Sequence, residues 1–190
     1  IYQDACTLEK LVDRLFLFSK LDLGQVSFMM ERVSLRDYFA DFAAENTERL
    51  AERGLILHYS PPAGPAWTAI DRMQFQRVID NLLENALKYK EGPTVTMDLH
   101  LAETPQAVGL TAADHGPGVP AADLPRLFDS FYRTDAARTD VQKLGLAIAK
   151  QIITTLHGQI HAEATPGGGL TVVITLPRIE EEYYETDSDH

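Results

Sequence analysis

The sequence predicts an α+β fold, a two-layer α/β sandwich with a mixed sheet, preceded by one bundle helix. Three observations lead to this prediction. Apolar residues recur at helical spacing near the N-terminus, a strict apolar–polar alternation follows residue 94, and short strand-like runs alternate with helices between residues 55 and 176. We expect strands from both halves of that region to share one sheet.

Residues 4–23 make up the first expected helix. Its apolar residues recur over a broad stripe: Leu8, Leu11, Val12, Leu15 and Phe18, widened by Phe16, Leu17, Leu21 and Leu23. A helix that is apolar over so much of its girth packs against neighbours on more than one side, as in a helix bundle. Gly24 is a typical stop for such a helix.

A strand-like run from Val26 to Val33 comes next. Ser34 and Asp37 then provide a capping signal for a second helix, which we expect to end at Gly54. After residue 54 the chain mixes strands with two further helices, the first of them capped by Asp71 and Gln74. The expected strands cover residues 55–59, 67–70, 95–101, 107–113, 159–164 and 170–176. Of the two expected helices, the first ends at residue 89 and the second covers residues 145–157.

The composition is that of an ordinary soluble protein, with 45% hydrophobic and 24% charged residues in a chain of 190. A net charge of −11 argues against nucleic-acid binding, which needs clustered Lys and Arg. The lone Cys6 excludes an intramolecular disulfide. No run reaches 18 apolar residues, so we expect no membrane span within these residues. The chain lacks an initiator Met and opens inside a helical pattern, which we interpret as a fragment of a longer protein.

The helical stretch from Phe75 to Tyr89 carries an ordered polar stripe. At about 100° per residue, Asn81, Asn85 and Lys88 fall on one line, with Tyr89 at its edge. The adjoining arc is apolar, as a core-facing surface should be. Two carboxamides and an ammonium beside an apolar face suit oxygen-rich ligands and a hard cation. The alternative for this stretch alone is a surface helix with incidental polar residues.

The second motif, Asp114 to Gly118, directly follows an expected strand. A carboxylate at a strand end can accept a hydrogen bond from an exocyclic amine such as adenine N6. Gly116 and Gly118 allow close backbone approach and positive φ. By itself this motif is also consistent with a plain Gly/Pro turn.

Two further motifs follow. Leu127 to Arg133 is rich in aromatic residues, which form either part of a ligand site or a small satellite core; Arg133 either holds phosphate oxygens or extends into solvent. In the run Leu144–Lys150, Gly145 enters a helix and can offer free backbone N–H groups to a phosphate, the alternative being a helix N-terminus without a ligand.

Taken together and in this order, the four motifs resemble those of the catalytic ATP-binding domain of sensor histidine kinases, within the ATPase superfamily that also includes gyrase, heat-shock chaperones and mismatch-repair proteins. The resemblance covers residues 31–178 and implies the histidine-kinase type of ATP-binding fold. The family's N, G1, F and G2 boxes resemble, in turn, Asn81–Tyr89, Asp114–Gly118, Leu127–Tyr132 and Leu144–Leu146. Residues 1–30 resemble the second helix of the dimerisation and histidine-phosphotransfer hairpin plus a linker, and residues 179–190 form an acidic tail.

The resemblance also implies roles for single residues. Asn85 resembles the Mg²⁺ ligand, Asn81 and Lys88 the phosphate contacts, Tyr89 the aromatic near the base, and Asp114 the adenine-specific carboxylate. The remaining expected ATP-binding residues are Gly116, Gly118, Phe131, Arg133, Leu144, Gly145 and Leu146. In hydrolases of the superfamily a glutamate that activates water stands in the place of Asn81, and a neutral carboxamide cannot be that base. The groove therefore resembles one that holds ATP intact for in-line transfer.

Two features depart from the family pattern. The acceptor histidine is expected on a helix upstream of residue 1, because none of the six histidines lies in the family's acceptor context. The G2 box normally carries Gly-x-Gly-x-Gly, whereas Val141 to Gly145 retains only the last glycine. Either the lid over the site has lost its glycines, or residues between about Asp140 and Leu144 are missing from the sequence. We favour the second interpretation, since glycine-rich lids without ligand are often not observed.

The resemblance implies the catalytic portion of a two-component sensor histidine kinase, with ATP and Mg²⁺ as cofactors. A response regulator is then the partner and the parent is a homodimer. This fragment would be cytoplasmic, with a parent anchored in the cell membrane. Two alternatives stay open. One is a degenerate nucleotide-binding or scaffold module with an impaired lid. The other is a serine kinase of the anti-sigma type, which shares the asparagine helix but lacks the bundle helix at residues 4–23.

Overall fold

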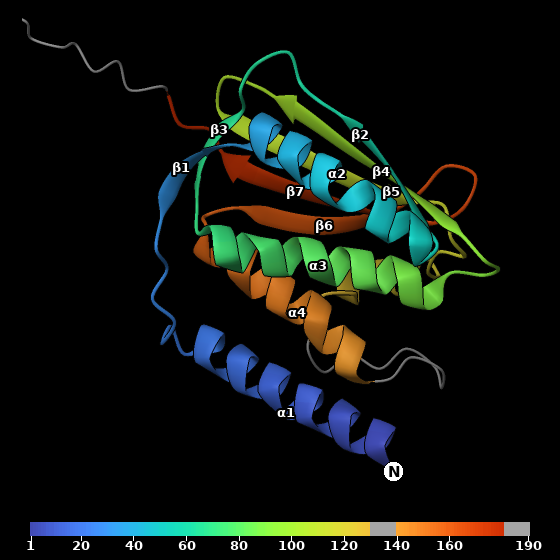
Figure 1. Cartoon of the computed structure of the whole chain (residues 1–190). Coiled ribbons are helices and arrows are strands. Elements are labelled where there is room, and N and C mark those ends of the chain that lie inside the picture. Colours follow the sequence, from blue (N-terminus) through green and yellow to red (C-terminus); the bar gives the residue numbers. More distant parts are fainter. Residues whose placement is uncertain (130–139, 181–190) are drawn as a thin grey trace, which may run out of the picture.

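The computed structural model describes residues 1–129 and 140–180, with side chains at 1–129 and 144–180. Its main element is a mixed five-stranded sheet in the order β2-β4-β5-β7-β6, covered on one face by helices (Figure 1). The pair β2–β4 is parallel and the other three pairs are antiparallel. The strands are β2 (Leu55–Ser60), β4 (Val95–Glu103), β5 (Ala107–Asp114), β6 (Gln159–Ala164) and β7 (Leu170–Pro177).

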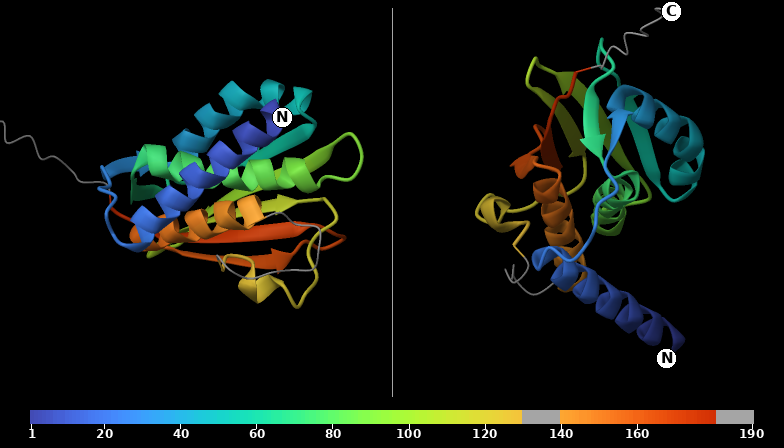
Figure 2. Two further views of the ribbon diagram at one scale, coloured as in Figure 1. Left: turned by 90° about the horizontal axis from the view of Figure 1, so that it is seen from below. Right: turned by 90° about the vertical axis from the view of Figure 1, so that its left-hand side faces the viewer.

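Within the described ranges, four α-helices accompany the sheet. Three of them, α2 (Leu35–Glu52), α3 (Arg72–Tyr89) and α4 (Asp140–Thr155), lie on the same face of the sheet, and α1 (Tyr2–Asp22) packs on the outside of α4 (Figure 2). A single turn of 3₁₀ helix, η1 (Leu124–Arg126), follows the loop after β5. The predicted helix, sandwich and mixed sheet are thereby confirmed.

Alternation along the strands decides which face is buried. In β4 the residues Val95, Met97, Leu99 and Leu101 are buried against the helices, while Asp98 and its neighbours of the same parity face outward. The helices contribute the facing half of the core, centred on Phe39, Phe75, Ile152 and Ile153. One continuous core therefore extends from α2 to α4 beneath the sheet.

Both predicted helix caps are confirmed. The Ser34 hydroxyl accepts a hydrogen bond from the backbone N–H of Asp37 at 3.3 Å, and Asp71 Oδ1 accepts one from the N–H of Gln74 at 3.0 Å. The second carboxylate oxygen of Asp71 accepts a hydrogen bond from the N–H of Met29 at 2.8 Å. This buried carboxylate therefore also attaches the linker after α1 to the start of α3.

Two predicted boundaries are wrong. The expected strand at residues 26–33 is β1 (Glu31–Ser34), because its antiparallel partner β3 (Trp67–Ile70) offers only four residues for pairing, in a small sheet separate from the main one. The helix expected from Gly145 begins at Asp140 instead. α4 runs without a break from Asp140 through Gly145, and our interpretation that lid residues are missing from the sequence stays a prediction.

Candidate nucleotide site

The polar stripe of α3 meets α4 at Asn81, whose Oδ1 lies close to Gly145. The apolar arc of the helix is buried in the core: Val78, Ile79, Leu82, Leu83 and Ala86. Asn81, Asn85 and Tyr89 on the adjoining stripe are partly buried, and Lys88 remains exposed. α3 and α4 pack along each other, and Asn81 of this stripe lines a pocket that residues of α1 and α4 also line.

Gly145 is where α4 meets the stripe most closely. A Cβ atom at this position would lie 3.1 Å from Asn81 Oδ1, which is closer than most real Cβ contacts. Its two neighbours in the G2 motif, Leu144 and Leu146, are buried in the core at 4% exposure each. The missing side chain therefore lets Asn81 approach the backbone of α4.

The role predicted for the N–H of Gly145 is wrong, however. Gly145 is the sixth residue of α4, and only the first four N–H groups of a helix lack an intrahelical partner. Its own N–H is therefore used inside the helix and is not offered to a phosphate. What the residue contributes is space beside Asn81.

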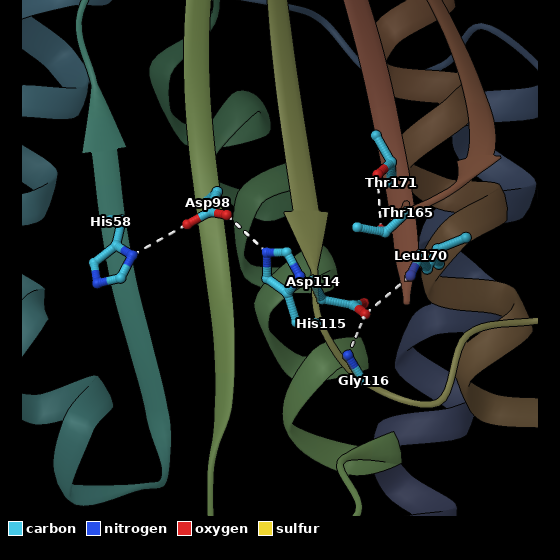
Figure 3. Close-up of polar contacts among 8 residues, drawn as sticks. All are labelled: His58, Asp98, Asp114, His115, Gly116, Thr165, Leu170 and Thr171. Carbon is cyan, nitrogen blue, oxygen red and sulfur yellow. Dashed lines mark hydrogen bonds and ion pairs between the residues drawn. The ribbon is translucent and has the colours of Figure 1, made fainter. Parts of the chain in front are cut away.

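Asp114 ends β5 on the buried face of the sheet, with 8% exposure. Its Oδ1 accepts hydrogen bonds from the backbone N–H groups of Gly116 at 3.1 Å and Leu170 at 3.0 Å (Figure 3). Among the described residues, both hydrogen bonds to this carboxylate fall on Oδ1. The arrangement fixes the side chain and leaves Oδ2 as an acceptor for an amine.

The turn between β6 and β7 supports this carboxylate. A Cβ atom on Gly169, which has φ +119°, would lie 2.0 Å from the backbone oxygen of Asp114, and one on Gly118 would lie 3.1 Å from the oxygen of Gly169. In the same turn region, the hydroxyls of Thr165 and Thr171 share a buried hydrogen bond of 2.9 Å (Figure 3). Nothing local to residues 165–171 indicates in the sequence that Gly169 packs against residue 114.

The outer face of the sheet carries a separate polar chain. Asp98 Oδ1 lies 3.1 Å from His58 Nδ1 and its Oδ2 lies 2.7 Å from His115 Nε2, so one carboxylate bridges two imidazoles (Figure 3). The hydrogen bond with His115 is the main cause that lowers the pKa of Asp98; partial burial opposes it and His58 adds to it. His115 adjoins Asp114, so this bridge also holds the beginning of the glycine-containing loop.

A protein-family comparison identifies the domain. The model described as Histidine kinase-, DNA gyrase B-, and HSP90-like ATPase matches residues 70–180, more than half of the chain. The chain belongs to this family. The match contains the α3 stripe, Asp114 and α4, the elements that carry the predicted site residues.

Two curated relatives match nearly the whole length of this chain. The sensor histidine kinase WalK of Bacillus subtilis (strain 168) is 33% identical over 182 residues, which covers 94% of this chain and 30% of WalK. The signal transduction histidine-protein kinase BaeS of Escherichia coli (strain K12) is 34% identical over 174 residues, covering 90% of this chain and 37% of BaeS. The chain therefore spans about a third of the length of these relatives.

A solved structure supports the fold. Full-length ShkA, crystallised in complex with AMPPNP, superposes with a TM-score of 0.76 at 21% identity, covering 95% of this chain and 38% of that chain. The described helices of the ATPase domain include none that is long and apolar enough to cross a membrane.

The donor set of the groove fits a magnesium ion carried by a nucleotide. Among the described side chains, no three His, Cys, Asp or Glu residues gather as a metal cluster. Mg²⁺ keeps several waters and commonly takes few protein ligands in addition to substrate phosphates. The carboxamide oxygen of Asn85 is a suitable hard donor for that arrangement, and Lys88 follows on the same stripe.

Partial desolvation lowers the pKa of the otherwise exposed Lys88 ammonium from its ordinary value, and the positive charge of Arg14 lowers it further. Its ammonium lies 5.8 Å from the centre of the Tyr89 ring. Of the aromatic motif, Leu127 and Phe128 are buried in the core. The predicted site residues Phe131 and Arg133 lie outside the described residues.

Proposed function

We propose that this domain binds Mg·ATP between α3 and α4 and serves a protein-histidine kinase. In the complete protein, the γ-phosphoryl group would pass to a histidine outside residues 1–190. The observation that carries the proposal is the pairing of a carboxamide–ammonium stripe with a fixed carboxylate, Asp114, at the end of β5. Membership of an ATPase family and the similarity to two sensor kinases support it.

The residues of the groove would act by position and charge. Asp114 would accept a hydrogen bond from the exocyclic amine of adenine through Oδ2, while Oδ1 stays bound to the backbone. Asn81 and Lys88 would hold phosphate oxygens. Asn85 would hold the Mg²⁺, which supplies charge neutralisation when bound.

Asn81 decides between transfer and hydrolysis in this proposal. A carboxamide has no proton-accepting form near neutral pH, so it cannot activate a water as a general base. Phosphoryl transfer then depends on alignment of the acceptor with the terminal phosphate. The domain would therefore hold ATP without hydrolysing it until a histidine is presented.

The partners follow from the same proposal. A response regulator would receive the phosphoryl group, and the parent would be a homodimer anchored in the cell membrane. The exposed apolar residues of α1 support a bundle partner in the parent: Leu8, Val12, Leu15 and Phe16 are 49–63% exposed. The expected division of the chain into a hairpin helix with its linker (residues 1–30), an ATP-binding domain (31–178) and an acidic tail (179–190) is part of this proposal.

A second candidate function rests on the G2 segment. Because Gly145 lies inside α4 and the other lid glycines are absent, the phosphates would receive fewer backbone N–H groups than a glycine-rich lid offers. A domain with such a lid could act as a scaffold that binds nucleotide weakly or not at all. Affinity distinguishes the two functions.

The deciding experiment is calorimetric titration of the domain with AMPPNP, with and without Mg²⁺. We expect Mg²⁺-dependent binding that falls by at least about tenfold in Asn85→Ala and in Asp114→Ala, the loss typical of one charged hydrogen bond or ligand. Glu84→Ala is the matched control, because Glu84 lies on the same helix but pairs with Arg53 on the other side. Unchanged affinity in both site variants would refute the site, and no binding by the wild type would favour the scaffold.

A further inference from the structure

Helix α1 brings a guanidinium group to the groove. Arg14 and Leu17 lie on the side of α1 that faces α4 and, with residues of α3, line a pocket of about 200 Å³. The complete lining is Arg14, Leu17, Arg77, Asp80, Asn81 and Ile148. Asn81 belongs both to this pocket and to the polar stripe, so the pocket connects the stripe with the bundle helix.

Arg14 and Asn81 converge on the same point of α4. A Cβ atom on Gly145 would lie 3.1 Å from Asn81 Oδ1 and 3.7 Å from Arg14 Nη1. The guanidinium and the carboxamide therefore flank one small space above the backbone of Gly145. Three helices, α1, α3 and α4, contribute to that space.

Positive charge is concentrated here. Arg14 is close enough to Lys88 to lower its pKa, and Arg77 lines the same pocket. Asp80, whose Oδ1 accepts a hydrogen bond from Gln76 at 2.9 Å, is the acidic residue of the lining and offsets one of these positive charges. Like charges held near one another repel, and a ligand with several negative charges relieves that repulsion.

We propose that Arg14 is a ligand of the terminal phosphate of bound ATP, supplied to the nucleotide site by the bundle helix. The inference rests on the proposed function. A guanidinium is suited to the role because its planar set of donors can bind two phosphate oxygens at once. Its place beside Asn81 assigns it to the end of the nucleotide that is transferred, away from the adenine contact at Asp114.

This assignment accounts for the departure in the G2 motif. The N–H of Gly145 is used within α4, so the backbone at this point offers the phosphates no donor. Arg14 replaces that donor with a side chain from another helix. Since binding and helix position are thermodynamically linked, a triphosphate would also favour the arrangement in which α1 packs on α4.

The test compares AMPPNP with ADP, which lacks the terminal phosphate, by calorimetry on the 190-residue chain. In Arg14→Ala we expect the affinity for AMPPNP to fall about tenfold, and that for ADP to change less than about twofold. Arg14→Lys should retain part of the preference, because it keeps the charge but not the planar fork. Lys20→Ala is the matched control: it also removes a positive charge from α1, at a side chain that stacks on Phe16.

The outcomes separate this inference from the proposed function. Equal changes for AMPPNP and ADP in folded Arg14→Ala, or the same selective loss in Lys20→Ala, would overturn the role of Arg14. Arg14→Gln, which keeps most of the stem, replaces Arg14→Ala if thermal unfolding shows that the alanine variant is not folded. If the role of Arg14 is overturned but the wild type binds ADP and Asp114→Asn does not, the nucleotide site is still supported. A wild type that binds neither nucleotide would refute both.

Discussion

The side chain of Asp114 and the backbone of Leu170 are joined by a hydrogen bond of 3.0 Å between the carboxylate Oδ1 and the N–H, although they are 56 positions apart. The turn that precedes Leu170 packs its Gly169 against the carbonyl of Asp114. The carboxylate expected to read adenine is therefore positioned by the β6–β7 turn as well as by its own strand.

Gly169→Ala is expected to disturb both the fold and the nucleotide site. The new Cβ would collide with backbone 2.0 Å away, at a φ of +119° that side chains rarely adopt, so we expect a loss of at least about 2 kcal/mol in the free energy of unfolding. Gly167→Ala is the control, since its φ is +86° but the space around it is open. Urea unfolding and AMPPNP titration measure the two effects. Equal losses of stability in both variants would show that backbone strain alone is responsible.

Asp71 is expected to contribute more to stability than an ordinary helix cap. Asp71→Ala removes the acceptor for two buried or part-buried N–H groups, those of Gln74 and Met29, and should cost about 2–4 kcal/mol. Asp71→Ser keeps one oxygen for the cap and should cost roughly half as much. The midpoint of urea unfolding measures the difference. If Asp71→Ser is as stable as the wild type, the hydrogen bond from Met29 contributes nothing to the free energy of unfolding.

The contacts of Asp98 with its two histidines should make the free energy of unfolding depend on pH in the acid range. The folded state lowers the pKa of Asp98 below the ordinary value of 3.8, so it favours the carboxylate. That stabilisation is complete above this ordinary pKa and is lost as the pH falls through the lower pKa of the folded state. We expect Asp98→Asn to be less stable than wild type at pH 6 and to approach it near pH 3.

Urea midpoints measured across that pH range test the expectation. Asp41→Asn, which removes an exposed carboxylate from α2, controls for the change of net charge. A difference between Asp98→Asn and wild type that stays constant down to pH 3 would contradict the assigned bridge.

Gly145→Ala should separate stability from binding. Alanine is favoured over glycine in a helix interior by about 1 kcal/mol, and the nearest atom to the new Cβ is the end of the Asn81 side chain, which can move. We therefore expect the free energy of unfolding to change by less than about 1 kcal/mol, while the displaced Asn81 weakens AMPPNP binding. Gly109→Ala is the control, since Gly109 has no positive φ and the nearest atom to its new Cβ is 3.9 Å away. Unchanged binding in Gly145→Ala would indicate that Asn81 does not contact the nucleotide.

Local patterns predicted much of this fold because the interactions concerned are short in sequence. The caps at Ser34 and Asp71 each connect residues three positions apart, and the buried face of α3 follows from helical periodicity alone. The prediction failed at β1 and at the start of α4. At β1, pairing is limited by a distant partner strand, and at α4 the helix continues through residues whose pattern resembles a loop.

By itself, the sequence determined the α+β class, the core face of α3, and the polar stripe of Asn81, Asn85 and Lys88. These properties depend on spacing along one element. Only the tertiary structure decided that Gly169 supports Asp114, that Gly145 makes room for Asn81, and that Arg14 reaches the same space from α1. Each of these contacts joins separate elements, and their relative positions come from packing of the whole core, which no local pattern encodes.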